Sequence, residues 1–157
     1  MPDPRATAVG SLRQLVTFHL AGERYALDIA GVREILDLPT ITPIPLTPPF
    51  VQGVVNVRGE IIACIDPAGI LGLQRTASTE SPALLVAMCG KRCLALVVDA
   101  VTGVRHVPEC DLEAPSPTLS SAATDFLQAI AQRGEEPLMI LDLDKFLAAD
   151  ALRALYG

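Results

Sequence analysis

Gln52-Gly-Val-Val-Asn-Val-Arg-Gly-Glu-Ile-Ile-Ala-Cys-Ile-Asp66 is the stretch that decides the fold of this 157-residue chain. It predicts two apolar strands joined by a tight polar turn. Side chains alternate at period two along a strand, so Asn56 and Arg58 share one face and the valines beside them share the other. Gly59 supplies the positive φ that a short hairpin connection needs. The stretch therefore holds one amide and one guanidinium rigidly beside an apolar sheet.

The composition favours many short strands over long helices. The chain contains 13 Pro and 11 Gly, 50% of its residues are hydrophobic, and it has no Trp. Proline and glycine mark turns, and the core must consist mainly of Val, Ile, Leu and Ala. About ten short strands at regular spacing, with short helices between them, are typical of small closed or nearly closed barrels.

The charge and hydropathy of the chain exclude several classes of function. A formal net charge of −6 argues against a nucleic-acid partner, because phosphate binding needs a concentrated basic patch. The apolar runs are shorter than the ~20 residues that span a bilayer. The first residues lack the hydrophobic core of a signal peptide. We therefore expect a cytoplasmic protein that reaches a membrane only through a partner.

Four cysteines are present, and their spacing matches no zinc motif. Cys89 and Cys93 bracket the expected tip of a hairpin and could face each other across it. Reduced thiols are the rule in a cytosolic protein, so free cysteines are the favoured interpretation and a Cys89–Cys93 pair stays open. We expect neither a metal nor a cofactor.

The first part of the chain predicts a tail, a hairpin and a short helix. Residues 1–13 are expected to form a flexible tail. Leu15–Leu20 and Tyr25–Ile29 alternate around a polar turn, which predicts a β-hairpin. Ile29–Leu36 then carries apolar side chains at helical spacing, with Asp28 as a candidate N-cap.

The middle of the chain predicts a connector, one helical turn and a boundary. Five prolines in residues 38–50 predict an extended surface segment, with an edge-strand piece around Ile41–Ile44. Pro67–Leu71 predicts a single helical turn. The polar segment Gly72–Ser81 is the best internal boundary.

The second half predicts a similar succession of elements, although the similarity is of pattern only and no sequence repeat is evident. Residues 122–132 favour a helix by propensity. Asp144 is expected to cap a C-terminal helix over residues 144–157. The expected strands of this half are Ala83–Met88, Cys93–Val98 and Val101–Val107.

The opening hairpin also resembles a known family. Gly53-Val-Val-Asn-Val-Arg-Gly59 is similar to the signature hairpin of the CheW family of chemotaxis coupling proteins, and the resemblance extends roughly from Leu15 to Leu147. Further matching segments follow the family order: Tyr25-Ala-Leu-Asp-Ile29, Val32-Arg-Glu-Ile-Leu36, Ile61-Ile62, Ile65-Asp66, Leu96-Val-Val-Asp-Ala-Val101 and Met139-Ile-Leu-Asp-Leu143.

The resemblance implies a mostly β fold with two five-stranded SH3-like β-barrel subdomains, short connecting helices and a C-terminal helix. It places a CheW-like domain over residues 14–147, with a first barrel at about 15–75 and a second at about 82–143. It also implies a strand across Phe126–Ala131 paired with Pro137–Leu143. We expect that strand in place of a helix, because tertiary pairing often overrides propensity.

The resemblance further implies an adaptor with no enzymatic activity. It would join the cytoplasmic helical hairpin of a chemoreceptor to the regulatory domain of a CheA-type histidine kinase, and receptors would recruit it to membrane arrays. Glu34, on the expected short helix, and Arg58 are expected to form an ion pair that holds this helix against the barrel and leaves an apolar rim for a partner. By motif match the receptor-facing residues are Val32, Glu34, Asn56 and Arg58, with Gly53 and Gly59 shaping the hairpin; Val98 and Asp99 are the candidates for the kinase contact.

The sequence departs from the family pattern in three places. Val57 stands where leucine is common, Ala63-Cys64 replaces Pro-Val, and Pro67-Ala68 replaces Leu-Arg. The third change removes a basic residue near a barrel end. An alternative function is therefore coupling in a non-flagellar chemosensory-type pathway, with surface motility or cyclic-dinucleotide output.

Two further alternatives belong to other classes. Asp66 and Asp99 each end an apolar strand, as in an aspartate-dependent hydrolase, but the Asp-Thr/Ser-Gly turns of aspartic proteases are missing. Strand-end carboxylates that accept backbone N–H bonds explain both residues.

Asp142 and Asp144 could bind a hard cation, although a helix cap is the commoner explanation. A barrel that binds a small ligand is the last alternative.

Overall fold

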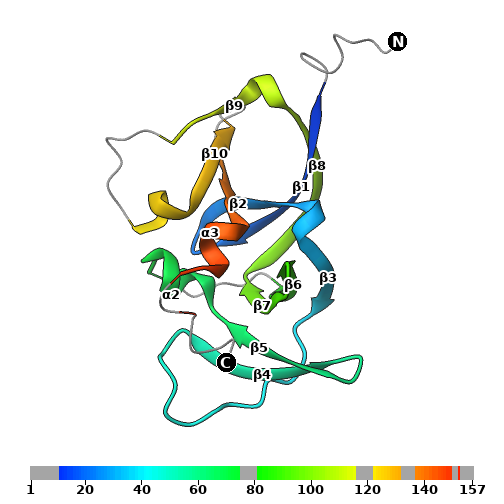
Figure 1. The fold of residues 1–157 in the computed structure, drawn as a ribbon, viewed down its shortest axis with the longest axis vertical. Coiled ribbons are helices and arrows are strands. Elements are labelled where there is room, and N and C mark those ends of the chain that lie inside the picture. Colours follow the sequence, from blue (N-terminus) through cyan, green and yellow to red (C-terminus); the bar gives the residue numbers. More distant parts are fainter. Residues whose placement is uncertain (1–10, 75–80, 116–121, 132–136, 150–151, 153–157) are drawn as a thin grey trace.

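Two β-sheets and a few short helices make up the structure, a computed structural model that describes residues 11–74, 81–115, 122–131, 137–149 and 152 (Figure 1). Residues 1–10 of the tail expected at 1–13, residues 75–80 of the boundary segment and most of the expected C-terminal helix beyond residue 149 lie outside these residues. The tail does not extend to residue 13 as expected, because the first strand begins at Leu12. The six-stranded sheet has the order β8-β1-β2-β11-β10-β9 and the five-stranded sheet the order β3-β6-β7-β5-β4.

The elements have the following bounds. The six-stranded sheet contains β1 (Leu12–Leu20), β2 (Glu23–Asp28), β8 (Ala100–Pro108), β9 (Leu112–Glu113), β10 (Leu127–Ala131) and β11 (Leu138–Leu141). The five-stranded sheet contains β3 (Val32–Asp37), β4 (Val51–Val57), β5 (Glu60–Ile65), β6 (Ala83–Cys89) and β7 (Arg92–Val98). The helices are η1 (Ile29–Gly31), α2 (Pro67–Leu71), η2 (Glu109–Asp111), η3 (Ala122–Phe126) and α3 (Leu143–Leu147).

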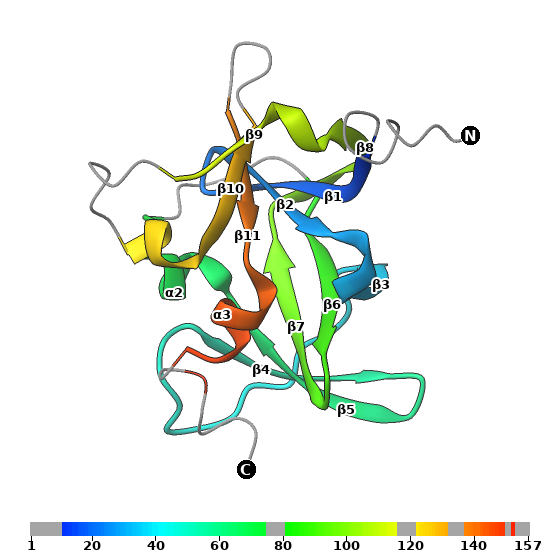
Figure 2. The ribbon, with the colours of Figure 1, turned by 45° about the horizontal axis from the view of Figure 1, so that its top comes forward.

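The sheets do not follow the expected division into sequential barrels. β1 and β2 pair with strands from the C-terminal half, whereas β6 and β7 pair with β3 and β5, so each sheet draws on both sides of the 72–81 segment. Figure 2 shows the two sheets stacked, with α2 and α3 beside their junction. The described strands form open sheets, and closure into five-stranded SH3-like barrels stays a prediction.

One connectivity describes both sheets. In each, an outer strand (β3 or β8) pairs with a hairpin (β6–β7 or β1–β2), whose second strand pairs in parallel with a second hairpin (β5–β4 or β11–β10). The outer strands carry related sequences, Gly31-Val-Arg-Glu-Ile35 and Gly103-Val-Arg-His-Val107. A linear comparison of the halves misses this relation, because the equivalent elements occur in circularly shifted order.

Among the residues that the structure describes, three apolar clusters form the core. The largest draws on both sheets and on both α-helices, and each smaller cluster belongs to one sheet. Side chains of β6 alternate between them: Leu84 faces the cluster of its own sheet and Leu85 faces the shared one. Because both faces of the sheet are covered, β6 is a continuous apolar run from Ala83 to Ala87 with every residue buried.

The helix predicted over Ile29–Leu36 is wrong. Only η1 is helical, and β3 follows it directly. Asp28 does act as an N-cap, since its carboxylate accepts a hydrogen bond from the Ala30 N–H at 3.0 Å. A β-bulge between Val32 and Glu34 adds a residue to β3 and disturbs its period of two. The apolar spacing of a bulged strand therefore resembled that of a helix.

Near the C-terminus the strand prediction is confirmed and the cap prediction is wrong. β10 pairs antiparallel with β11, and only residues 122–126 before it are helical. α3 begins two residues earlier than expected, because Asp142 rather than Asp144 caps it by accepting from the Lys145 N–H at 3.1 Å. Phe146 and Leu147 are buried as predicted.

All four cysteines are free. The β6–β7 register pairs Cys93 with Met88 and Cys89 with Arg92, so the two cysteines are not cross-strand partners. Among the described residues no helix is long and apolar enough to cross a membrane.

The burial of Cys64 predicts selective thiol labelling. Burial raises the pKa of the Cys64 thiol to about 12, and the negative charge of Asp66 adds to the shift, whereas Cys110 is exposed. We expect a thiol reagent at pH 8 to label Cys110 in the native protein, and Cys64 only in denaturant, as read by mass spectrometry. Because the fold favours the neutral thiol, its contribution to stability is present below the unfolded pKa of about 8.5 and is lost as pH rises above it. Rapid native labelling of Cys64 would contradict this assignment.

Candidate functional site

The tip of the β4–β5 hairpin is a two-residue turn. Val57 pairs with Glu60, which leaves Arg58 and Gly59 as the loop, and their φ values of 53° and 87° are those of a type I′ turn. The Asn56 side chain accepts a hydrogen bond from the Gly59 N–H at 2.8 Å. The predicted hairpin is confirmed, and Asn56 uses its side-chain oxygen to hold the turn.

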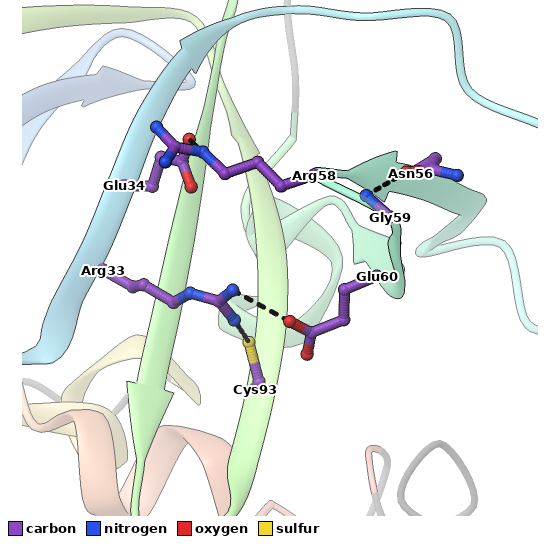
Figure 3. A network of polar contacts seen from close by, with 7 residues as sticks. All are labelled: Arg33, Glu34, Asn56, Arg58, Gly59, Glu60 and Cys93. Atoms are coloured by element: carbon purple, nitrogen blue, oxygen red, sulfur yellow. Dashed lines mark hydrogen bonds and ion pairs between the residues drawn. The ribbon is translucent and has the colours of Figure 1, made fainter.

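The bulge in β3 directs two successive charged residues toward this tip. Val32 pairs with Ala87 and Glu34 with Val86, which leaves Arg33 as the extra residue. In an unbulged strand Arg33 and Glu34 would face opposite sides. Figure 3 shows both side chains reaching the hairpin from β3.

Two ion pairs connect β3 to the hairpin tip. The Arg58 Nε donates to Glu34 Oε2 at 3.0 Å, and the Arg33 Nη2 donates to Glu60 Oε1 at 2.8 Å. The predicted Glu34–Arg58 pair therefore forms, with Glu34 13% exposed and Arg58 79% exposed. Arg33 also lies 3.8 Å from the Cys93 sulfur through its Nη1 (Figure 3). We call Arg33, Glu34, Arg58 and Glu60 the ion-pair cluster.

The Arg33–Glu60 contact predicts a measurable pKa shift. The hydrogen bond from Arg33 and then its positive charge lower the pKa of the Glu60 carboxyl below its usual value. We expect a carboxyl NMR titration to place Glu60 below an ordinary exposed glutamate. We expect Arg33→Gln to return its pKa to the usual range, because the charge and the charge-assisted hydrogen bond are removed together. An unchanged pKa in Arg33→Gln would show that the pair does not persist in solution.

Gly53 allows a second segment to cross the hairpin. Its φ is +140°, and a Cβ at this position would lie 2.1 Å from the Thr42 carbonyl oxygen. Thr42 and Val54 exchange two backbone hydrogen bonds of 2.9 Å here. The proline-rich connector is thus tied to β4 by a single bridge where an edge strand was expected. Gly53 thus allows the close approach of the Thr42 backbone to β4.

Val98 and Asp99, the candidates for the kinase contact, are both buried. Val98 is 0% exposed in the shared core and Asp99 is 6% exposed. The Asp99 carboxylate accepts the Ala21 N–H at 2.9 Å. Asp66 likewise caps α2 by accepting the Ala68 N–H at 3.0 Å. These contacts support the structural explanation for both aspartates over the hydrolase hypothesis.

Sequence reasoning missed Arg33 and Glu60. The available signal was charge: Arg33 and Glu34 on one segment are opposite in sign to Glu60 and Arg58, respectively, on the other. It could not be used while residues 29–36 were assigned to a helix. Val32 packs against the shared core, whereas Ile35, the residue after Glu34 on β3, is 42% exposed.

A cleft of about 380 Å³ adjoins the start of β3. It lies where η1, the β6–β7 turn, β10, β11 and α3 meet, and Gly31, Met88 and Leu143 are among its lining residues. Gly31 permits this meeting, because a Cβ there would lie 2.4 Å from the Leu143 side chain. Cys89 donates to Asp144 in the wall of the cleft, and this bond raises the pKa of its thiol. Met88 and the nearby Ile29 are each 37% exposed.

The described residues contain no group of three or more His, Cys, Asp or Glu side chains that could hold a metal ion. Asp142 and Asp144, the candidate cation ligands, have a cap and a thiol as their partners. The site thus consists of fixed charges and apolar side chains beside a cleft, which suits binding to another protein.

Comparison with known proteins identifies the family. The model of the CheW-like domain matches residues 14–151. This chain belongs to the CheW-like domain family. The chemotaxis protein CheW of Treponema pallidum is 30% identical to it over 147 residues, which cover 90% of this chain and 86% of that CheW. Protein FrzA of Myxococcus xanthus is 28% identical over 144 residues, covering 90% and 89% of the two chains.

A solved CheW structure has the same fold. The crystal structure of the scaffolding protein TtCheW from Thermoanaerobacter tengcongensis is 31% identical and superposes with a TM-score of 0.79, covering 89% of this chain and 95% of that one. The family resemblance inferred from the β4–β5 hairpin is therefore confirmed across most of the chain.

Proposed function

We propose that this chain is a chemotaxis coupling adaptor that joins the cytoplasmic helical hairpin of a chemoreceptor to the regulatory domain of a CheA-type histidine kinase. Membership of the CheW-like family carries the proposal, together with the similarity to TtCheW, which is described as a scaffolding protein. An adaptor acts through shape and fixed contacts, and it transforms no molecule. We place it in the cytoplasm, recruited to membrane arrays by the receptors it binds.

The receptor-facing surface comprises the exposed part of the ion-pair cluster and the adjoining cleft. A helix can lie in such a groove with apolar anchors at i, i+3 and i+4. Met88 and Ile29 offer apolar contacts beside the cleft, and Ile35 offers one on β3. Arg58 supplies a charge that is fixed by Glu34. Gly53 and Gly59 keep the hairpin in the conformation that presents it.

For the kinase-facing surface we propose residues around Val98 and Asp99 in place of these two side chains themselves, because both are buried. The shared connectivity of the two sheets supports two barrel-like units of SH3 type with similar free ends. Similar but non-identical ends can dock head to tail, and such heterologous contacts close into rings. Each interface can be weak, at about 1,200 Å² or below, because an array raises the effective concentration.

A non-flagellar pathway is the second candidate. FrzA of Myxococcus xanthus is 28% identical and covers 90% of this chain, the same share as the chemotaxis protein CheW of Treponema pallidum. The absence of a basic residue after Asp66, where the chain reads Pro67-Ala68, also separates it from the usual pattern. Capture of receptor and kinase from chemotaxis operons, compared with capture of those encoded beside this gene, distinguishes the two pathways.

Affinity capture tests the adaptor proposal. Immobilised protein should retain a chemoreceptor signalling hairpin and, separately, a CheA-type regulatory domain. Retention of neither at high concentration would overturn the proposal. Loss of both in a variant with a disrupted fold serves as the specificity control.

A further inference from the structure

The edges of the five-stranded sheet are joined by side chains at the hairpin tip. β3 and β4 are the two outer strands in the order β3-β6-β7-β5-β4. The ion-pair cluster connects the tip of the β4–β5 hairpin, at one edge of the sheet, to β3 at the other edge (Figure 3). A single ion pair would let the tip turn about one contact, whereas two pairs at separate points oppose that rotation.

The charges of the cluster also specify one position of the tip along β3. Arg33 and Glu34 follow each other on β3, and they meet Glu60 and Arg58 of opposite sign. Exchanging the partners would place Arg33 beside Arg58 and Glu34 beside Glu60. Like charges at such contacts are destabilising, so the pattern disfavours the alternative arrangement.

Arg58 depends on this arrangement. Its φ of 53° lies in the left-handed region, and its side chain is 79% exposed, with Nε bonded to Glu34. A planar guanidinium recognises a partner best when its orientation is fixed. Arg33 lies on the other side of the same tip, where it bonds to Glu60 and to the Cys93 sulfur, whereas Arg58 bonds to Glu34.

We infer that Arg33 and Glu60 form a positioning pair that fixes the hairpin tip so that Arg58 faces the helical partner in the correct orientation. The inference rests on the proposed function for the identity of the partner. The pair acts through Arg58 and makes no direct contact with the partner. The Arg33–Glu60 pair restrains the hairpin tip in addition to the Glu34–Arg58 pair. This restraint requires opposite charges at positions 33 and 60.

The first test measures the tip without any partner. Amide hydrogen exchange over residues 56–60 should become about fivefold faster in Arg33→Glu. The substitution replaces the attraction between Arg33 and Glu60 with repulsion between two carboxylates, and about fivefold corresponds to the strength of an exposed ion pair. Glu60→Arg should behave similarly. The double variant R33E/E60R should return exchange to within about twofold of the wild type, because the pair is restored with reversed polarity. Arg105→Glu, at the equivalent place in β8, is the charge-matched control and should leave the tip unchanged.

The second test measures binding to a chemoreceptor signalling hairpin by calorimetry. Each single variant should bind the receptor hairpin about fivefold more weakly, and the double variant should recover the wild-type affinity. Urea denaturation should show that all three variants remain folded. Binding to a kinase regulatory domain should stay unchanged in all three variants. A merely structural role would weaken both interactions together.

Three results would overturn the inference. Wild-type exchange at the tip in Arg33→Glu would show that the pair does not restrain it. Single variants that weaken binding without recovery in the double variant would show direct contact of Arg33 or Glu60 with the partner. Equal weakening of kinase binding would show a general effect on the fold. If the wild type fails to bind the receptor hairpin, the proposed function fails, and the exchange data still decide whether the pair fixes the tip.

Discussion

Gly53→Ala is expected to lower the free energy of unfolding by about 3 kcal/mol or more. A non-glycine residue at a φ of +140° costs about 1–3 kcal/mol on its own. The new Cβ would also lie 2.1 Å from the Thr42 carbonyl oxygen, which belongs to backbone and cannot rotate away. The bridge between Thr42 and Val54 must then open, with the loss of two hydrogen bonds of about 0.5–1.5 kcal/mol each.

Gly103→Ala provides a matched control for this prediction. Gly103 has a φ of +134°, close to that of Gly53, but a Cβ there would have no heavy atom within 4 Å. Urea denaturation should therefore report a loss of only about 1–3 kcal/mol, the backbone strain alone. Equal losses in the two variants would mean that the crossing of the proline-rich segment over β4 adds nothing to the stability of the hairpin.

Arg58→Glu is expected to weaken binding to a chemoreceptor signalling hairpin by at least about tenfold while the fold is retained. The substitution removes an exposed guanidinium and places a second carboxylate beside Glu34, which is only 13% exposed. Removing one member of a hydrogen-bonded charge pair that is buried at an interface costs about 2–5 kcal/mol, and 1.4 kcal/mol corresponds to a factor of ten. Calorimetry measures the affinity and circular dichroism checks the fold.

The charge-reversed double variant E34R/R58E separates the two roles of Arg58. It restores an ion pair between β3 and the hairpin tip, but it presents a carboxylate where the partner expects a guanidinium. We expect binding to remain weak, which would assign direct contact to Arg58. Full recovery would assign Arg58 a positioning role only, and unchanged binding in the single variant would remove Arg58 from the site.

Local features of the sequence were sufficient to predict the hairpins. Alternation and a turn glycine lie within a few residues of each other, so the β4–β5 hairpin and the β1–β2 hairpin follow from the chain alone. β3 could not be predicted in this way. Its bulge at Arg33 is stabilised by pairing with β6, about fifty residues away, and no local pattern encodes that pairing.

The membership of the sheets was equally non-local. β2 pairs in parallel with β11 across more than a hundred residues, and only the three-dimensional arrangement reveals that β3 and β8 are equivalent strands. The same limit applies to the site. Glu34 and Arg58 were identified through the family resemblance, whereas Arg33 and Glu60 emerge only once β3 is a strand. The burial of Val98 could not be predicted either, because a strand-end valine gives no sign of whether it faces a core or a partner.

Simultaneous binding of both partners tests the adaptor account most directly. Purified protein, a chemoreceptor signalling hairpin and a CheA-type regulatory domain should be mixed at equal concentrations above their pairwise dissociation constants and analysed by sedimentation velocity. The account predicts a ternary species heavier than either binary complex, and the same species should be depleted in Arg58→Glu. Mutually exclusive binding, with two binary complexes and no ternary one, would contradict the claim that this protein connects a receptor to a kinase.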